Sequence, residues 1–148
     1  MLTDYVLAAG SLSFGISLRR NSTSSSRTAW LWPLGFFCGA AAALIGGTFH
    51  GFAAMQSAGT HAALWNITLL LIGISAGFMI SAALCGPLKA DAQNTRWLRA
   101  GAILSVAGLL IQTGRVSFFS NFNHNDLYHC IQTVALYFLF RGARLSAF

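Results

Sequence analysis

Residues 61–85 read HAALWNITLLLIGISAGFMISAALC, an apolar run that contains no Asp, Glu, Lys or Arg. A run of roughly 20 apolar residues is long enough to cross the ~30 Å hydrocarbon layer of a bilayer as an α-helix. Gly86 and Pro87 follow directly, and both residue types favour the end of a helix. The stretch therefore predicts a transmembrane helix and decides the fold class.

Four further segments on either side of this run are also apolar. Only 8% of the 148 residues are charged, whereas a soluble domain carries about 25% charged residues. We therefore predict a single all-α domain over residues 1–148, an integral membrane bundle of five transmembrane helices. The predicted spans cover approximately residues 2–18, 30–52, 61–85, 96–112 and 123–140.

The basic residues predict the orientation of these spans. Five spans place Arg115 alone on one side of the membrane. On the other side they place Arg19, Arg20, Arg27, Lys89, Arg96, Arg99, Arg141 and Arg144. By the positive-inside rule, the N-terminus lies outside and the C-terminus is cytoplasmic. We predict a multi-pass protein of the bacterial inner (cell) membrane. Its partner is the lipid bilayer and not nucleic acid, because the basic residues mark loops instead of one face.

All four histidines lie at helix ends that this topology places outside the membrane. His50 ends the second span, His61 begins the third, and His124 and His129 begin the fifth. Histidine is uncommon inside bilayers and is a frequent metal ligand. Zn²⁺ takes nitrogen and oxygen ligands. We therefore predict a zinc site formed by His50, His129 and one of His61 or His124.

Two of the three acidic residues, Asp4 and Asp126, join the histidines at this end, whereas Asp91 is predicted to be cytoplasmic. In a zinc site either acid would serve as a general base or would orient a ligating histidine. Asp126 has a second interpretation, because Asn123 is a good N-cap and an acid three residues later suits a helix N-terminus. The alternative for Asp4 is an exposed interfacial acid.

Polar residues on the predicted helices support this cluster. Asn125, His129 and Gln132 are spaced i, i+4 and i+7, so they share one face of the last helix. Such a face is expensive in lipid and predicts contact with other helices. Asn66 is predicted either to reach the cluster or to bond a neighbouring helix.

Small residues predict two close helix contacts. Gly46 and Gly47 precede His50, and glycines let a neighbouring helix approach closely. They favour burial of the His50 imidazole, and the alternative for His50 is an interfacial anchor. Gly73 and Gly77 form a second packing step.

The cluster is compatible with several classes of function. A zinc-dependent hydrolase would attack a lipid ester or amide with a metal-activated water. Alternatively, His50 and His129 on facing helices would hold a haem. A third class is a non-enzymatic subunit of a membrane complex, with other membrane proteins as partners. Transport and sensing remain open as well.

The histidines also carry a resemblance to a known group of proteins. His50 on an early helix, His61 on the next, and the motif NHNDLYHCIQTVALYFLFRGA at residues 123–143 resemble the CREST superfamily. That superfamily includes alkaline ceramidases and progestin/adipoQ-type receptors. The resemblance implies a zinc-dependent lipid amide hydrolase, and it implies His50 and His129 as metal ligands. The motif is also similar to small uncharacterised bacterial multi-span membrane proteins.

Overall fold

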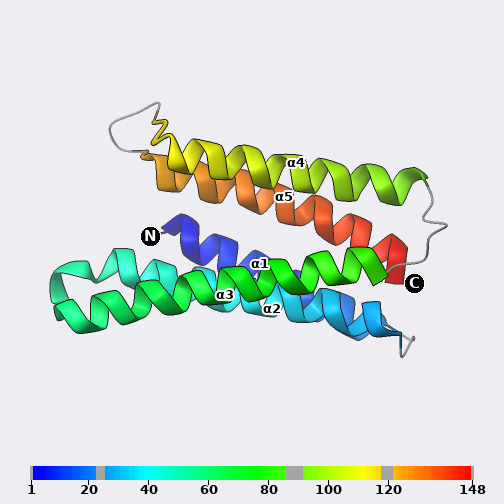
Figure 1. Ribbon diagram of the computed structural model, residues 1–148, viewed down its shortest axis with the longest axis horizontal. Helices are drawn as coiled ribbons and strands as arrows, with labels where there is room; N and C mark the ends of the chain where they lie inside the picture. Colours follow the sequence, from blue (N-terminus) through cyan, green and yellow to red (C-terminus); the bar gives the residue numbers. More distant parts are fainter. Residues whose placement is uncertain (1, 23–25, 86–91, 118–121, 148) are drawn as a thin grey trace.

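The computed structural model describes residues 2–22, 26–85, 92–117 and 122–147. Within these ranges the chain forms five α-helices and one short 3-10 turn, so the all-α prediction is confirmed. The elements are α1 (Leu2–Asn21), α2 (Arg27–Gly51), η1 (Ala53–Met55), α3 (Ala58–Cys85), α4 (Ala92–Thr113) and α5 (His124–Ala147). Consecutive helices run in opposite directions along one long axis (Figure 1). Lys89, Asp91, Gly86 and Pro87 lie outside the described residues.

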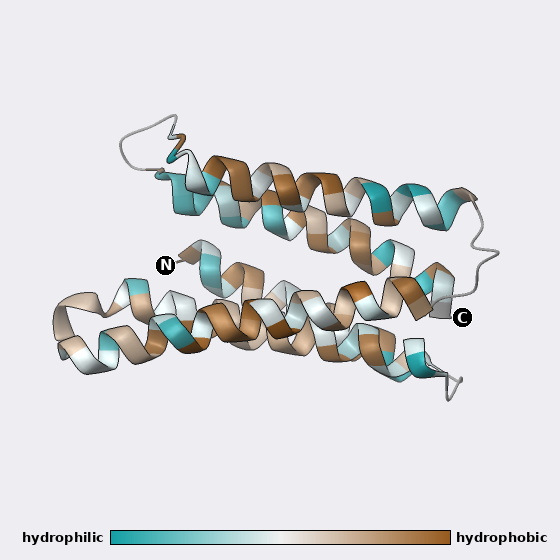
Figure 2. Cartoon of the chain, viewed as in Figure 1, coloured by the Kyte–Doolittle hydropathy of each residue, from teal (hydrophilic) through white to brown (hydrophobic). Residues whose placement is uncertain are grey.

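The observed helices are longer than the predicted apolar segments. α5 runs to Ala147 instead of residue 140, and α4 begins at Ala92 instead of residue 96. Hydrophobicity marks only the part of a helix that is apolar, whereas backbone hydrogen bonding continues into the polar ends. Figure 2 shows these ends as hydrophilic and the middle of α3 as hydrophobic.

Among the described helices, α2 and α3 have the length and composition of membrane spans. α1 contains Asp4 and several serines, and α5 opens on a polar run from His124 to Gln132, so their mean hydropathy is lower. The presence of all five spans, and their orientation, stay predictions.

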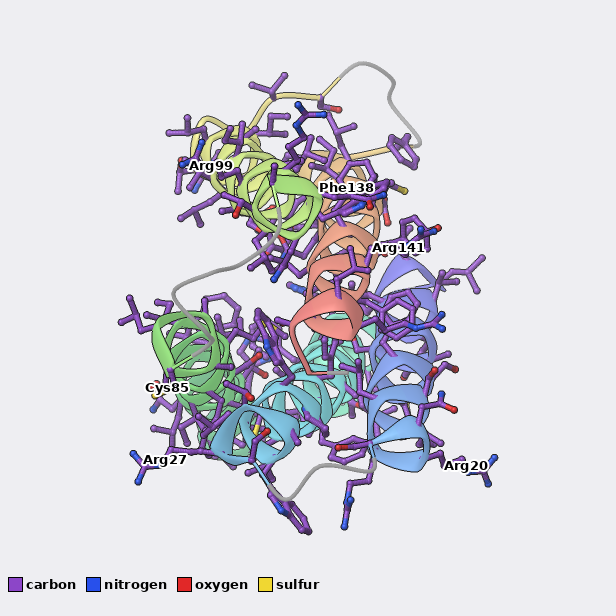
Figure 3. The ribbon with its side chains drawn as sticks, turned by 90° about the vertical axis from the view of Figure 1, so that its right-hand side faces the viewer. Arg20, Arg27, Cys85, Arg99, Phe138 and Arg141 are labelled. Carbon is purple, nitrogen blue, oxygen red and sulfur yellow. The ribbon has the colours of Figure 1, made fainter. Side chains whose placement is uncertain are left out.

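The helices pack in the spatial order α3, α2, α1, α5, α4. Extensive contacts join α2 to α3, α1 to α2 and α4 to α5, whereas α1 meets α5 over a smaller surface and α2 touches α5 lightly. Viewed along the long axis, α3, α2 and α1 form a row, with α5 above it and α4 beyond α5 (Figure 3). The α4–α5 hairpin is therefore held to the other helices mainly through α1.

Aromatic rings fill the middle of the α1–α5 contact. Phe14 of α1 stacks on Phe140 of α5 with ring centroids 4.7 Å apart, and it meets Phe36 of α2 edge-on at 5.8 Å. Phe36 is completely buried. Such ring pairs contribute about 0.5–1.5 kcal/mol beyond the area they bury.

Glycines decide how closely the helices approach, and the close contact predicted at Gly46 and Gly47 is present, whereas the one predicted at Gly73 and Gly77 is not. A Cβ at Gly101 of α4 would lie 2.7 Å from Leu139 Cγ and 3.0 Å from the Ala135 carbonyl oxygen of α5. Around Gly73 and Gly77 of α3 no described atom lies within 4 Å of such a Cβ. The predicted Gly73–Gly77 packing step is therefore wrong within this chain, because this face of α3 has no neighbouring helix.

We expect Gly101→Ala to lower the stability of the protein by about 1–3 kcal/mol, because the new methyl group meets a backbone oxygen that cannot move aside. Gly73→Ala is the matched control and should cause no loss, since its methyl group enters open space. Thermal unfolding of both variants in detergent measures the difference. Equal stability of the two variants would contradict the close α4–α5 contact.

Candidate functional site

Asp4 is buried at the start of α1, with an exposed fraction of only 2%, so it is not an exposed interfacial acid. Two glycines of α2 make room for its side chain. A Cβ at Gly47 would lie 3.0 Å from the Asp4 Cβ, and one at Gly46 would lie 3.8 Å from Asp4 Oδ1. The glycines therefore admit the Asp4 carboxylate between α1 and α2.

His50 occupies a different place from the one predicted. Its side chain is exposed, so the prediction that Gly46 and Gly47 bury this imidazole is wrong. The reason is the length of α1. His50 lies in the last turn of α2, whereas α1 begins at Leu2, next to the glycines one turn earlier.

The first turn of α5 is capped by its own side chains. Asn123 Oδ1 accepts hydrogen bonds from the backbone N–H groups of Asn125 at 2.9 Å and Asp126 at 3.2 Å. Asp126 Oδ2 accepts one in return from the Asn123 N–H at 3.4 Å. This is the reciprocal arrangement of a capping box. Capping thus accounts for one oxygen of Asp126 and leaves Oδ1 for another contact.

That other contact joins α5 to α1 through a residue that sequence reasoning did not select. The Thr3 hydroxyl donates to Asp126 Oδ1 at 2.8 Å, and Thr3 Oγ1 lies 3.3 Å from His129 Nδ1. On its other side, His129 Nε2 lies 3.4 Å from Asp4 Oδ1. His129 is buried, with an exposed fraction of 9%. We call Thr3, Asp4, Asp126 and His129 the α1–α5 network.

The number of hydrogens in this network limits its chemistry. A hydrogen bond has one hydrogen between its two heavy atoms. Three hydrogens are therefore needed for the contacts Thr3–Asp126, Thr3–His129 and His129–Asp4. The Thr3 hydroxyl supplies one and a neutral imidazole supplies a second. With both carboxylates ionised, one contact would bring two lone pairs together in a buried place, which is unfavourable. The network therefore has room for one additional proton.

Opposing effects act on a positive charge at His129. Burial is the largest of these effects and disfavours the charge, Asp4 favours it, the nearby His50 disfavours it, and Asp126 favours it. His50 in turn interacts with Asp4 and His61. These titratable groups belong to α1, α2, α3 and α5, and they lie at the same end of the bundle.

His61 belongs to a separate aromatic cluster at the turn between α2 and α3. The ring of Phe49 lies 4.0 Å from His61, 4.8 Å from His50 and 5.1 Å from Trp65, measured between ring centroids. His61 Nδ1 also contacts Gln56 Oε1 at 3.0 Å. The contacts of the His61 ring are thus with Phe49 and Gln56 and not with His129.

The remaining residues that the sequence predicted for the site lie outside the α1–α5 network. Gln112 of α4 donates to Asn125 Oδ1 at 2.5 Å, and Gln132 donates to Ser105 Oγ of α4 at 3.4 Å. The polar face of α5 is therefore split, with Asn125 and Gln132 toward α4 and His129 toward α1. Asn66 is exposed on α3, and His124 is the first residue of α5.

The predicted three-histidine zinc site does not fit this arrangement. Within the described residues no three His, Cys, Asp or Glu side chains are grouped so that they could hold a metal ion. In addition, Thr3 and Asp4 engage both ring nitrogens of His129, and a metal ligand needs one nitrogen free. Zinc and haem binding stay predictions.

A family model fits almost the whole chain. It describes a family of unknown function (DUF6962) and matches residues 1–92 and 84–147. The chain belongs to this family. No curated protein and no solved structure matches this DUF6962 chain. The resemblance to the CREST superfamily stays a prediction.

We expect Thr3→Val to destabilise the protein by about 1–3 kcal/mol, because valine has the same shape but leaves buried polar atoms of Asp126 and His129 without this partner. Thr113→Val is the matched control. The Thr113 hydroxyl is exposed and donates to carbonyl groups of its own helix. Thr113→Val should therefore leave the free energy of unfolding almost unchanged. Unfolding in detergent measures both. A Thr3→Val variant as stable as the control would show that the network contributes nothing to stability.

Proposed function

We propose that this DUF6962 chain is a five-span membrane protein that binds a proton at its outward end and responds to the pH of the outer compartment. The α1–α5 network is the proposed site. The observation that supports this proposal is the shortage of hydrogens, since three contacts, two of them partly buried and one buried, share the two hydrogens of Thr3 and a neutral His129. A bound proton supplies the third.

The distribution of charge supports the proposed orientation. The described acids, Asp4 and Asp126, begin α1 and α5 at one end of the bundle. Arg20, Arg27 and Arg141 lie near the other end, which faces the viewer in Figure 3. With that arginine-rich end cytoplasmic, as the positive-inside rule requires, the network opens toward the outside.

Loss of the proton would act on the contact between α1 and α5. Without it, one of the contacts Thr3–Asp126, Thr3–His129 and His129–Asp4 brings two lone pairs together, and that contact becomes repulsive. Because α1 and α5 share a small surface, this end of the contact then loosens. The Phe14–Phe140 stack, farther along both helices, still holds them together. Protonation would thus set the separation of the outer ends of α1 and α5.

We expect the protein to be most stable at acid pH and to lose stability as the pH rises. The sign follows from proton linkage, because above the ordinary histidine pKa of about 6.5 the folded network retains a proton that the same groups have released in the unfolded chain. The loss should reach about 1.4 kcal/mol for each pH unit over which the proton is released. Unfolding in detergent between about pH 5 and 8, where histidine charge changes, measures this slope.

Two variants and one control make this test specific. His129→Gln and Asp4→Asn remove a titrating partner while retaining hydrogen-bonding groups, so each should flatten the slope. His61→Gln is the matched control, because His61 belongs to the Phe49 cluster and not to the network, and it should keep the slope of the parent. An undiminished slope in both His129→Gln and Asp4→Asn would rule out the proposed site.

The order of groups in the network supports a second candidate, a hydrolase acting on a lipid ester or amide. Thr3 Oγ1, the His129 ring and Asp4 lie in the order of a nucleophile, a general base and an orienting carboxylate. This candidate is weaker, because the Thr3 hydroxyl lies closer to Asp126 than to His129. A nucleophile must instead give its hydrogen to the base.

Hydrolysis of a chromogenic ester in detergent micelles tests the second candidate. If Thr3 is the nucleophile, the purified protein hydrolyses the ester above background. Thr3→Val and His129→Gln should then each reduce the rate at least about 100-fold, the scale of a lost catalytic base, while His61→Gln keeps it. No hydrolysis by the parent, or equal rates in all variants, would remove the hydrolase from consideration.

A further inference from the structure

A basic cavity lies at the other end of the α1–α5 contact, far from the network. Its volume is about 410 Å³, and it is lined by Asn21 at the end of α1 and by Arg141, Arg144 and Leu145 of α5. A second hollow of about 390 Å³ adjoins it through Asn21 and adds Arg20, Ser13, Ile16 and Ser17 of α1. Arg141 and Arg144 thus line the cavity between the two helices, whereas the second hollow lies on α1 alone, and Figure 3 shows the Arg20 and Arg141 side chains apart from each other.

Aromatic rings position two of these guanidinium groups without neutralising them. The Arg141 Cζ lies 5.1 Å from the Trp97 ring centroid, and Arg141 Nη1 donates to the Tyr137 hydroxyl at 3.2 Å. The Arg144 Cζ lies 5.8 Å from the Phe140 ring centroid. A guanidinium group has five N–H donors, so most donors of both arginines remain for a ligand.

No described carboxylate supplies the counter-charge. Asp4 and Asp126 belong to the opposite end, and Asp126 is about 27 Å from Arg144 along α5 at 1.5 Å per residue. Charges that far apart are screened from each other. The C-terminal ends of α1 and α5 favour nearby cations, but two partial charges do not balance the two full charges of Arg141 and Arg144. The cavity therefore calls for a mobile anion.

The shape of this surface indicates which anion. Arginine binds phosphate through paired N–H donors. Beside the arginines, Leu145, Ile16 and Leu12 expose apolar side chains, and Leu12 and Ile16 follow α1 toward the middle of the bundle. A phosphate on the guanidinium groups would place an attached acyl chain along this apolar strip.

We propose that Arg141 and Arg144, with Asn21 beside them, form a phosphate-binding site, whose ligand is the headgroup of an anionic phospholipid of the cytoplasmic leaflet or a free phosphate ion. This site is independent of the proton network, because it shares no residue with it and lies at the other end of the bundle. Either ligand would tie the end of α1 to the end of α5.

Thermal unfolding of the full chain in detergent tests this site with three additives, which are phosphatidylglycerol, phosphatidylcholine and inorganic phosphate. We expect phosphatidylglycerol to raise the unfolding temperature and phosphatidylcholine not to do so. Stabilisation by inorganic phosphate to the same extent would identify the free ion as the ligand. Stabilisation by neither phosphatidylglycerol nor inorganic phosphate would overturn the proposal.

Charge-matched variants separate the cavity from general surface charge. The double variant Arg141→Gln/Arg144→Gln should weaken phosphatidylglycerol binding roughly tenfold or more, since hydrogen bonds to a charged group are lost. Arg27→Gln/Arg99→Gln removes the same charge from exposed arginines outside the cavity and should bind like the parent. If the first pair does not fold, Arg144→Gln alone changes one exposed side chain and should still weaken binding. Equal weakening by cavity and control variants would overturn the proposal.

Discussion

The burial of one carboxylate, that of Asp4, constrains one end of this helix bundle. A buried charge needs a partner, because transfer out of water is costly. His129 of α5 lies against the Asp4 carboxylate as a partner. Glycines on α2 leave the room that the Asp4 side chain occupies. Since α4 reaches the remaining helices mainly through α5, the Asp4–His129 contact also helps to hold the two parts of the bundle together.

The fold class and the polar end of the bundle could be predicted from the sequence, whereas the site itself could not. The length of the apolar segments and the positions of the basic residues can be read from the sequence without knowing how the helices pack. Which side chains meet depends on where each helix begins and how it is rotated. His50 and Asp4 lie at similar depth. However, α1 begins beside Gly47 and does not extend as far as His50. Thr3 was missed because a threonine beside an acid at a chain start resembles an ordinary helix cap.

The polar face of α5 illustrates the same limit. Spacing correctly placed Asn125, His129 and Gln132 on one face of a helix, yet that face lies over a junction between two neighbours. Asn125 and Gln132 bond α4, and His129 bonds α1. Helical spacing alone therefore groups residues of α5 that contact different neighbouring helices. The three-histidine zinc prediction also rests on shared depth, which does not by itself place side chains next to one another.

The two ends of the α1–α5 contact pose the same electrostatic problem with opposite sign. Excess negative charge gathers around Asp4 and Asp126, and excess positive charge gathers around Arg141 and Arg144. At about 27 Å, the helix length between Asp126 and Arg144, the two groups are beyond a screening length of about 8–10 Å. Neither end can therefore neutralise the other directly. The proposed ligands are a proton at the acidic end and an anion at the basic end. Both ligands would bridge α1 to α5, so the strength of this contact would depend on conditions on both sides of the membrane.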